Sequence, residues 1–248
     1  MFKTRRIQTL RNAKSASGDL ENSQHAVYFP GDNGDGMNLG VELASTFAGD
    51  FSTSQWLWST ATDGSDSGYI WLTGSTGNIN YLLVYEDDAY YGVDSANANI
   101  ASSVWNTHRW NHIVTSYDDT NNVAKTFLNG IEVDSDSLDK EVITDGVNLT
   151  VGAGTNLTDY NSKGYVSDFA IYNNNMTINE VKTIYNNKAP FNHMKWQFSK
   201  YLVGWWQCGD GKENAAGTTI YDMSTNSNNF TLRGNVAIKP YPNPLQIK

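Results

Sequence analysis

The feature that most constrains this fold is a series of short apolar segments separated by turns rich in Gly, Asn, Asp and Ser. In "FSTSQWLWS" (51–59) the tryptophans Trp56 and Trp58 alternate with other residues, as they do on a β-strand. The turn "TDGSDS" separates this segment from "GYIWL" (68–72). Similar segments occupy 26–29, 79–85, 109–118, 123–134, 147–154 and 163–172. Many short strands at regular spacing predict an all-β protein, an antiparallel β-sandwich.

Two local signals add detail to this pattern. The dipeptide Asn129–Gly130 lies between two strand-like segments, and it predicts a tight hairpin. In "TINEVKTIYN", Thr177 is followed three residues later by Glu180, the spacing of a helix capping box. One short α-helix is therefore expected after the last of these strands.

Composition excludes several classes of protein. The net charge is −9, so we expect no nucleic-acid partner, because phosphate binding needs clustered cations. No apolar run approaches the roughly 20 residues of a membrane helix, so we expect no membrane insertion. The single cysteine, Cys208, excludes an internal disulfide.

The first 24 residues are polar and basic, with too little apolar surface to fold alone. No apolar stretch follows the basic residues, so the sequence predicts no secretory signal and synthesis in a cytoplasm. We expect an extended arm over 1–24 that anchors the chain to an acidic protein surface. The anchoring residues would be Arg5, Arg6, Arg11 and Lys14.

Four stretches, taken in order, resemble a known family. They are "AVYFPGDNGDGMNLG", "FSTSQWLW", "WNHIVTSYDDTNNVAKTFLNGIEV" and "LTVGAG…KGYVSDFAIYNNNMTINEVKTIYN". The series is similar to laminin-G-like domains of the concanavalin A-like lectin/glucanase superfamily, over about 25–187. The resemblance implies a jelly-roll β-sandwich of that type.

The stretch "YLVGWWQCGDG" (201–211) resembles the strand with which such domains usually begin, yet here it comes last. It could close the same sandwich, as in a circular permutant, or belong to a neighbouring subunit. We favour closure of the same sandwich, because so short a segment has too little core alone. Trp205 and Trp206 would point to opposite faces, with at least one in the core, and Cys208 would be a buried apolar residue. The predicted organisation is therefore an arm over 1–24, a sandwich over 25–234 that 200–234 completes, and an extended tail over 235–248.

Catalysis is the first function to weigh. The superfamily contains glucanases with several carboxylates on one strand face, and "EVDSD" offers Glu132, Asp134 and Asp136. The last carboxylate is an Asp, and the segment follows the hairpin turn directly, so we interpret it as a solvated strand face. His112 in "WNHIV" is interpreted as a packed, hydrogen-bonded residue, because no nucleophile motif accompanies it. The chain is therefore expected not to be an enzyme.

Calcium is the best metal candidate. The loop "GDNGD" places Asp32, Asn33 and Asp35 close together, and hard oxygen ligands suit Ca²⁺. In the family a carboxylate of the closing strand often joins this loop, and the resemblance implies that role for Asp168. The expected cofactor is a structural Ca²⁺ ion or none.

Sugar binding would need an exposed aromatic side chain near loops, with polar neighbours. The candidates are Trp71, Tyr90, Tyr91, Trp105 and Tyr160, each of which could equally pack between strands.

Two functions from different classes follow. The first is a non-catalytic structural protein that decorates a large assembly, a bacteriophage virion surface or appendage, with glycans as further ligands. Its partners would be other structural proteins of that assembly and further copies of itself. The alternative is a free carbohydrate-binding lectin module, and a glycoside hydrolase is a distant third.

Overall fold

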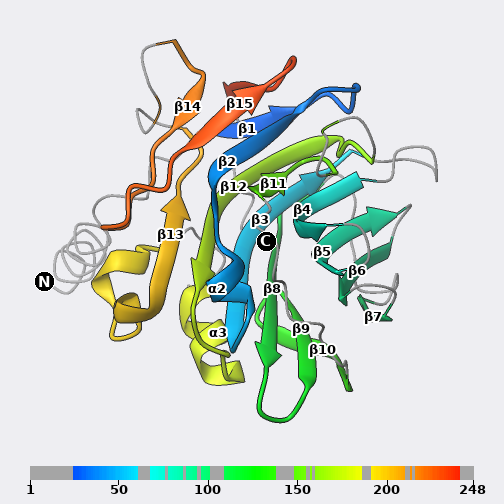
Figure 1. Ribbon diagram of the computed structural model, residues 1–248, viewed down its shortest axis with the longest axis vertical. Helices are drawn as coiled ribbons and strands as arrows, with labels where there is room; N and C mark the ends of the chain where they lie inside the picture. The colour runs from blue at the N-terminus through cyan, green and yellow to red at the C-terminus, as the bar shows by residue number, and fades with distance from the viewer. Residues whose placement is uncertain are drawn as a thin grey trace, which may run out of the picture.

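The structure is a computed structural model, and it describes residues 25–60, 68–75, 78–85, 88–93, 96–100, 109–137, 148–154, 157, 160–185, 191–209, 213 and 216–240. These residues form two antiparallel sheets that pack face to face (Figure 1). The arrangement confirms the β-sandwich that the strand pattern predicts. In the described part of the chain, no helix is long and apolar enough to cross a membrane.

The first sheet, called sheet A, is built around the long strand β12. In spatial order it contains β10 (Ile131–Ser137), β9 (Val123–Leu128), β8 (Asn111–Asp118), β3 (Phe51–Ser59), β12 (Gly164–Tyr172), β1 (His25–Phe29) and β16 (Ala237–Pro240), and β13 (Leu202–Trp206) also pairs with β12.

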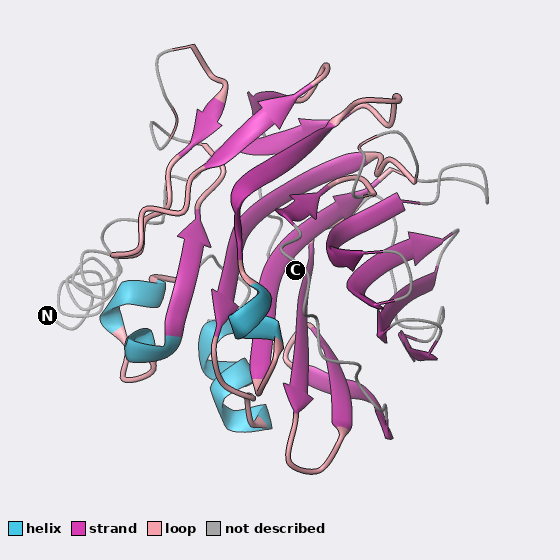
Figure 2. Cartoon of the chain, viewed as in Figure 1, coloured by secondary structure: helices cyan, strands magenta, loops and turns pink. Residues whose placement is uncertain are grey.

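The second sheet, called sheet B, packs against one face of sheet A. Its spatial order is β14 (Thr219–Ile220), β15 (Phe230–Arg233), β2 (Gly36–Glu42), β11 (Asn148–Val151), β4 (Gly68–Ser75), β5 (Asn78–Tyr85), β6 (Asp88–Val93) and β7 (Ala96–Ile100). The helical segments are few and short (Figure 2): α2 (Ala44–Phe47), α3 (Ile178–Tyr185) and the 3₁₀ turns η3 (His193–Lys195) and η4 (Ser199–Tyr201).

Strand β12 has β3 along one side and two strands end to end along the other. β1 pairs with residues 164–166 of β12, and β13 pairs with residues 169–172. The two strands meet at a β-bulge between Ser167 and Ala170, where Asp168 has a φ of 51°. The segment 202–233 therefore contributes strands to both sheets of this sandwich.

The two tryptophans of β13 lie on opposite faces, as strand alternation predicts. Trp206 is fully buried between the sheets, and Trp205 is buried on the outer face of sheet A. Cys208 is also fully buried, in agreement with its interpretation as an apolar residue. Neither tryptophan is available to stack on a sugar.

The turn between β14 and β15 explains the motif "DMSTNSN". The carboxylate of Asp222 accepts hydrogen bonds from the backbone N–H of Trp205, Ser224 and Asn228 and from the Ser224 hydroxyl. One half-buried carboxylate thus fixes this turn and links it to β13.

The predicted tail boundary at 235 is wrong. Residues 237–240 form β16, which pairs with β1 in the register Tyr28↔Ala237 and Ala26↔Lys239. Ile238 packs against the core between the sheets, which anchors this edge strand. The sequence misled because a short edge strand that ends in Pro240 carries little strand signal.

The core has two parts. The larger cluster lies between the sheets and includes Val27, Val166, Leu57 and Trp206. The smaller cluster lies on the outer face of sheet A, where α3 and the connector 191–201 cover Tyr172, Ala170 and Trp205. Sheet A is thus buried on both faces over this half.

The helix and hairpin signals are confirmed. In the capping box, Thr177 N–H donates to the Glu180 carboxylate at 2.6 Å, and Glu180 N–H donates to the Thr177 hydroxyl at 3.4 Å. Val181 and Ile184 are buried against the sheet. Asn129 and Gly130 have φ angles of 51° and 79°, as a hairpin turn of this kind requires.

Candidate functional site

A row of four aromatic side chains crosses the outer face of sheet A, on the half that α3 leaves free. Tyr28 of β1 lies opposite Tyr165 of β12, and Tyr165 lies opposite Trp58 of β3. The rings of Tyr28 and Tyr165 are 4.9 Å apart, and those of Trp58 and Trp110 are 6.0 Å apart. We call this set (Tyr28, Tyr165, Trp58, Trp110) the aromatic row.

Strand alternation explains why the row faces outward. Val27, Val166 and Leu57 precede or follow the row residues in their strands, and they belong to the core between the sheets. Their neighbours must therefore point to the other face. Within the row, Trp58 is buried. The other three residues, Tyr28, Tyr165 and Trp110, are half-buried and remain partly accessible.

The adjacent cross-strand pair on the same face, Trp56 and His112, is covered by α3. Tyr185 of α3 stacks on His112, with ring centroids 5.6 Å apart, and on Trp56 at 5.9 Å. His112 Nε2 lies 2.9 Å from the Ser54 hydroxyl. His112 is therefore a packed, hydrogen-bonded residue, as expected, and α3 forms one wall beside the aromatic row.

A cation lies at one end of the row. Lys239 Nζ lies 3.7 Å from the centroid of the Tyr28 ring. The side chain is exposed, and it belongs to the same face because Lys239 lies opposite Ala26. This part of the outer face of sheet A thus combines partly accessible aromatic side chains, the adjacent helix α3 and the positive charge of Lys239. Burial raises the pKa of Tyr165, so its hydroxyl stays protonated at neutral pH.

This arrangement suits a sugar ring. The C–H face of a hexose is apolar and packs against aromatic rings, while its hydroxyls need hydrogen-bonding groups at the edge. The hydroxyls of the half-buried Tyr28 and Tyr165 are such groups. Sequence reasoning missed this set, because its members are joined only by strand register and lie up to 137 positions apart (Tyr28 to Tyr165).

Two of the five predicted sugar-binding aromatics are wrong as stacking residues. Trp71 and Tyr91 are fully buried between the sheets, with ring centroids 6.1 Å apart. Trp71 also packs against Phe47 of α2 at 5.9 Å. A register shift between Tyr69 and Trp71 turns Trp71 into the core, which alternation alone could not reveal.

The other three have different outcomes. Tyr160 has 56% of its surface exposed and lies in the loop before β12. Tyr90 lies in β6, opposite Leu83, but its side chain is outside the described part of the structure, and Trp105 is outside the described residues altogether. The arm residues Arg5, Arg6, Arg11 and Lys14 also lie outside it.

The four predicted metal ligands are not brought together. The buried carboxylate of Asp35 accepts hydrogen bonds from the backbone N–H of Asp32 at 3.1 Å and of Asn235 at 2.5 Å. It fastens the loop before β2 to the turn between β15 and β16. Asp32 and Asn33 are exposed.

Asp168 has a separate set of partners on the other sheet. Its carboxylate accepts hydrogen bonds from Trp205 Nε1 at 2.6 Å and Phe191 N–H at 3.1 Å, and His193 Nε2 lies 3.5 Å away. The residues present do not fit a calcium site that joins Asp168 to the Asp32–Asp35 loop. Within the described residues, no group of three or more His, Cys, Asp or Glu side chains could hold a metal ion.

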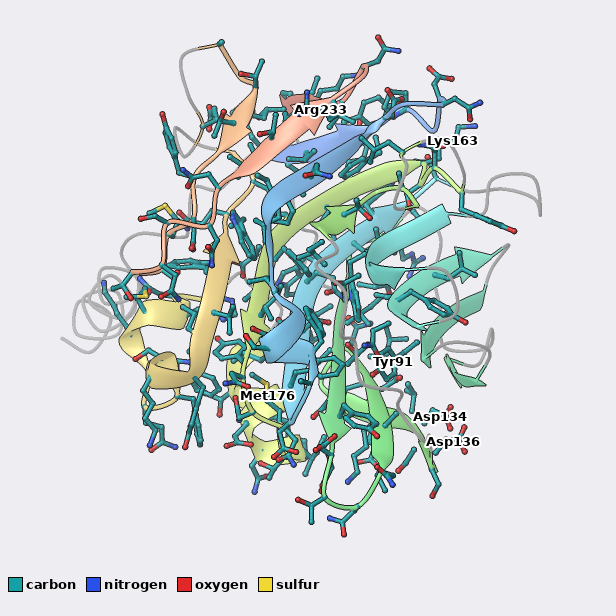
Figure 3. The ribbon with its side chains drawn as sticks, in the orientation of Figure 1. Tyr91, Asp134, Asp136, Lys163, Met176 and Arg233 are labelled. Carbon is teal, nitrogen blue, oxygen red and sulfur yellow. The ribbon has the colours of Figure 1, made fainter. Side chains whose placement is uncertain are left out.

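The carboxylates of β10 do not share one face. Glu132 lies opposite Phe127, whose side chain faces outward, and a register shift separates Glu132 from Asp134. Asp134 and Asp136 lie opposite Thr126 and Ala124. Figure 3 shows Asp134 and Asp136 together at the β10 edge, far from Lys163 at the opposite end. The one-face geometry of a glucanase is therefore absent from β10.

Comparison with known proteins agrees with this description. The family model of the concanavalin A-like lectin/glucanases superfamily, a laminin-G-like model, matches residues 31–182. The chain belongs to that superfamily. Among curated proteins, no sequence matches the chain.

Several solved structures share the fold. A provisional carbohydrate binding protein from Bacteroides ovatus is 17% identical with a TM-score of 0.67, and the match covers 91% of this chain and 62% of that protein. The SAP-like pentraxin of Limulus polyphemus is 14% identical with a TM-score of 0.55, over 68% of this chain and 85% of the pentraxin. The CBM40 of Ruminococcus gnavus IT-sialidase, bound to α2,3-sialyllactose, is 12% identical with a TM-score of 0.53, over 66% of this chain and 99% of the module. The chain spans 62% of the length of the first of these proteins. The protein thus has the concanavalin A-like lectin fold.

Proposed function

We propose that this protein is a non-catalytic glycan-binding module, and that the aromatic row is its binding face. The carrying observation is the row Tyr28–Tyr165–Trp58–Trp110. Three of these residues, Tyr28, Tyr165 and Trp110, are only half-buried, on the part of the outer face of sheet A that α3 leaves free. The superfamily and the carbohydrate-binding neighbours support the same function.

The binding test is a titration of the full chain with a panel of oligosaccharides, followed by the variants Tyr165→Ala and Trp110→Ala. Each variant should weaken binding about tenfold or more, because it removes part of the apolar surface that the sugar covers. The control is Tyr221→Ala, since Tyr221 has 43% of its surface exposed on the segment between β14 and β15. This control should bind as the wild type does.

The variant Tyr160→Ala separates the two candidate faces. Tyr160 lies in the loop that precedes β12, and its neighbour Asn161 donates to the carbonyls of Asp35 and Leu157. If Tyr160→Ala abolishes binding while Tyr165→Ala does not, the site lies at the rim. That result would keep the function and refute the aromatic row.

The second part of the proposal places this module in a larger assembly, as a decoration protein of a virion surface. It is supported by the sequence alone, through the basic segment 1–24 with Arg5, Arg6, Arg11 and Lys14. Removal of residues 1–24 should abolish attachment to the assembly and leave the sandwich folded. A truncated protein that attaches at full strength would contradict this role.

A further inference from the structure

We infer that the aromatic row selects acidic sugars, with Lys239 supplying the cation that pairs with a sugar carboxylate. The inference rests on the proposed glycan-binding function and deepens it by naming the class of ligand.

The position of Lys239 is the first step. β16 is hydrogen-bonded to β1 with Ala237 opposite Tyr28, so Lys239 lies two residues further along the same face. Its ammonium lies 3.7 Å from the Tyr28 ring centroid and therefore covers the first ring of the row. A sugar would stack on Tyr165 and Trp110, with the ammonium beside it.

The second step is that, among the residues that the structure describes, no carboxylate forms an ion pair with this ammonium. The ion pairs of the described residues join Lys125 to Glu132 and His193 to Asp168, and none involves Lys239. Within the described residues, its contact is the weak attraction to the Tyr28 ring, which leaves the ammonium's N–H donors for a ligand.

The third step concerns the ligand. An ammonium forms a charge-assisted hydrogen bond with a carboxylate that is stronger than one with a neutral hydroxyl. Sugars that carry a carboxylate, the uronic and sialic acids, also have the ring surface that packs on an aromatic residue. The row and the cation together therefore match a carboxylated sugar.

The test compares matched pairs of probes: lactose with sialyllactose, and an oligogalacturonate with its methyl ester. The wild-type full chain should bind at least one acidic probe about tenfold more tightly than its neutral partner. Lys239→Met should remove this preference and leave the affinity for the neutral probe unchanged, while Lys239→Arg should retain it. The preference should also weaken as salt is added.

The matched control is Lys200→Met. Lys200 is also exposed and also lies over a tyrosine ring, 4.7 Å from the Tyr201 centroid, but on η4 rather than beside the row. This variant should keep the preference in full.

The outcomes separate the two proposals. Equal affinity of the wild type for acidic and neutral probes, or a preference that survives Lys239→Met, overturns the role of Lys239 and leaves the glycan-binding function standing. Binding to no probe overturns both.

Discussion

The indole Nε1 of Trp205 donates a 2.6 Å hydrogen bond to Oδ1 of Asp168, and this bond joins β13 to the bulge of β12. Oδ2 of the same carboxylate accepts from Phe191 N–H and faces His193. The other ring nitrogen of His193, Nδ1, is hydrogen-bonded to the hydroxyl of Tyr172. This buried network holds the connector 191–201 on the outer face of sheet A, at the position where the family resemblance implied a metal ligand.

Replacement of Asp168 should therefore be costly. Asp168→Ala leaves the Trp205 N–H and the Phe191 N–H without their buried acceptor, and it should lower the free energy of unfolding by about 3 kcal/mol or more. Asp168→Asn keeps an acceptor and tolerates the positive φ, so it should cost less. Urea titration measures both.

The control for this prediction is Asp136→Ala, because Asp136 is exposed on β10. It should change stability by no more than about 0.5 kcal/mol. An Asp168→Ala protein as stable as the Asp136→Ala protein would show that the network contributes nothing.

A chelator should leave the thermal midpoint of the wild type unchanged, because protein donors already occupy the carboxylates of Asp35 and Asp168.

Local signals in the sequence predicted much of the fold. The capping box of Thr177 and Glu180, the Asn129–Gly130 turn and the alternation in β3 each depend on residues that are near one another in the chain. Such features can be predicted from the sequence because they arise from interactions between residues that are close together in the chain.

The candidate site was harder to predict because it depends on register and bulges. Alternation in "QWLW" shows that Trp56 and Trp58 share a face, but not that Tyr165 lies beside Trp58. One bulge moves Trp71 into the core, and another separates Glu132 from Asp134. A single inserted residue reverses every later assignment to a face, and sequence patterns do not mark where it occurs.

The stability of the fold should fall on acidification because of His112. Burial lowers the pKa of His112 from 6.5 to about 3, with the nearby Asp168 acting in the opposite direction and His193 in the same one. Between these values the unfolded chain binds a proton that the folded protein does not, so stability is lost as the pH falls from about 6.5 towards 3. This one group contributes a slope of about 1.4 kcal/mol per pH unit at most.

The measurement is urea unfolding at several pH values for the wild type and for His112→Gln. The variant removes the titrating group, so its stability should depend less steeply on pH over this window. Parallel curves for the two proteins would show that folding does not lower the pKa of His112.

Cys208 should be inert in the native protein. Its side chain is fully buried, and burial raises the pKa of the thiol to about 12, so almost no thiolate forms at pH 8. A thiol reagent such as Ellman's reagent should react in denaturant and not in native buffer over the same period. Rapid reaction of the native protein would mean that the segment after β13 opens.

The amide of Asn80 offers the sharpest test of the packing between the sheets. Asn80 on β5 is fully buried and lies opposite Thr73, and neither its amide nitrogen, its amide oxygen nor the Thr73 hydroxyl has a hydrogen-bond partner in the structure. Because an unpaired buried amide is unfavourable, Asn80→Leu should leave the free energy of unfolding unchanged or raise it by about 1 kcal/mol.

Asn161→Leu is the matched comparison for Asn80→Leu. The buried Asn161 amide donates to the carbonyl oxygens of Asp35 and Leu157, so its replacement removes two hydrogen bonds and should cost about 1–3 kcal/mol. Opposite signs for the two Asn→Leu changes in urea titrations would show that hydrogen bonding, rather than side-chain volume, decides the outcome. A loss of more than about 1 kcal/mol in Asn80→Leu would mean that buried water satisfies the amide, since only a paired amide is costly to remove.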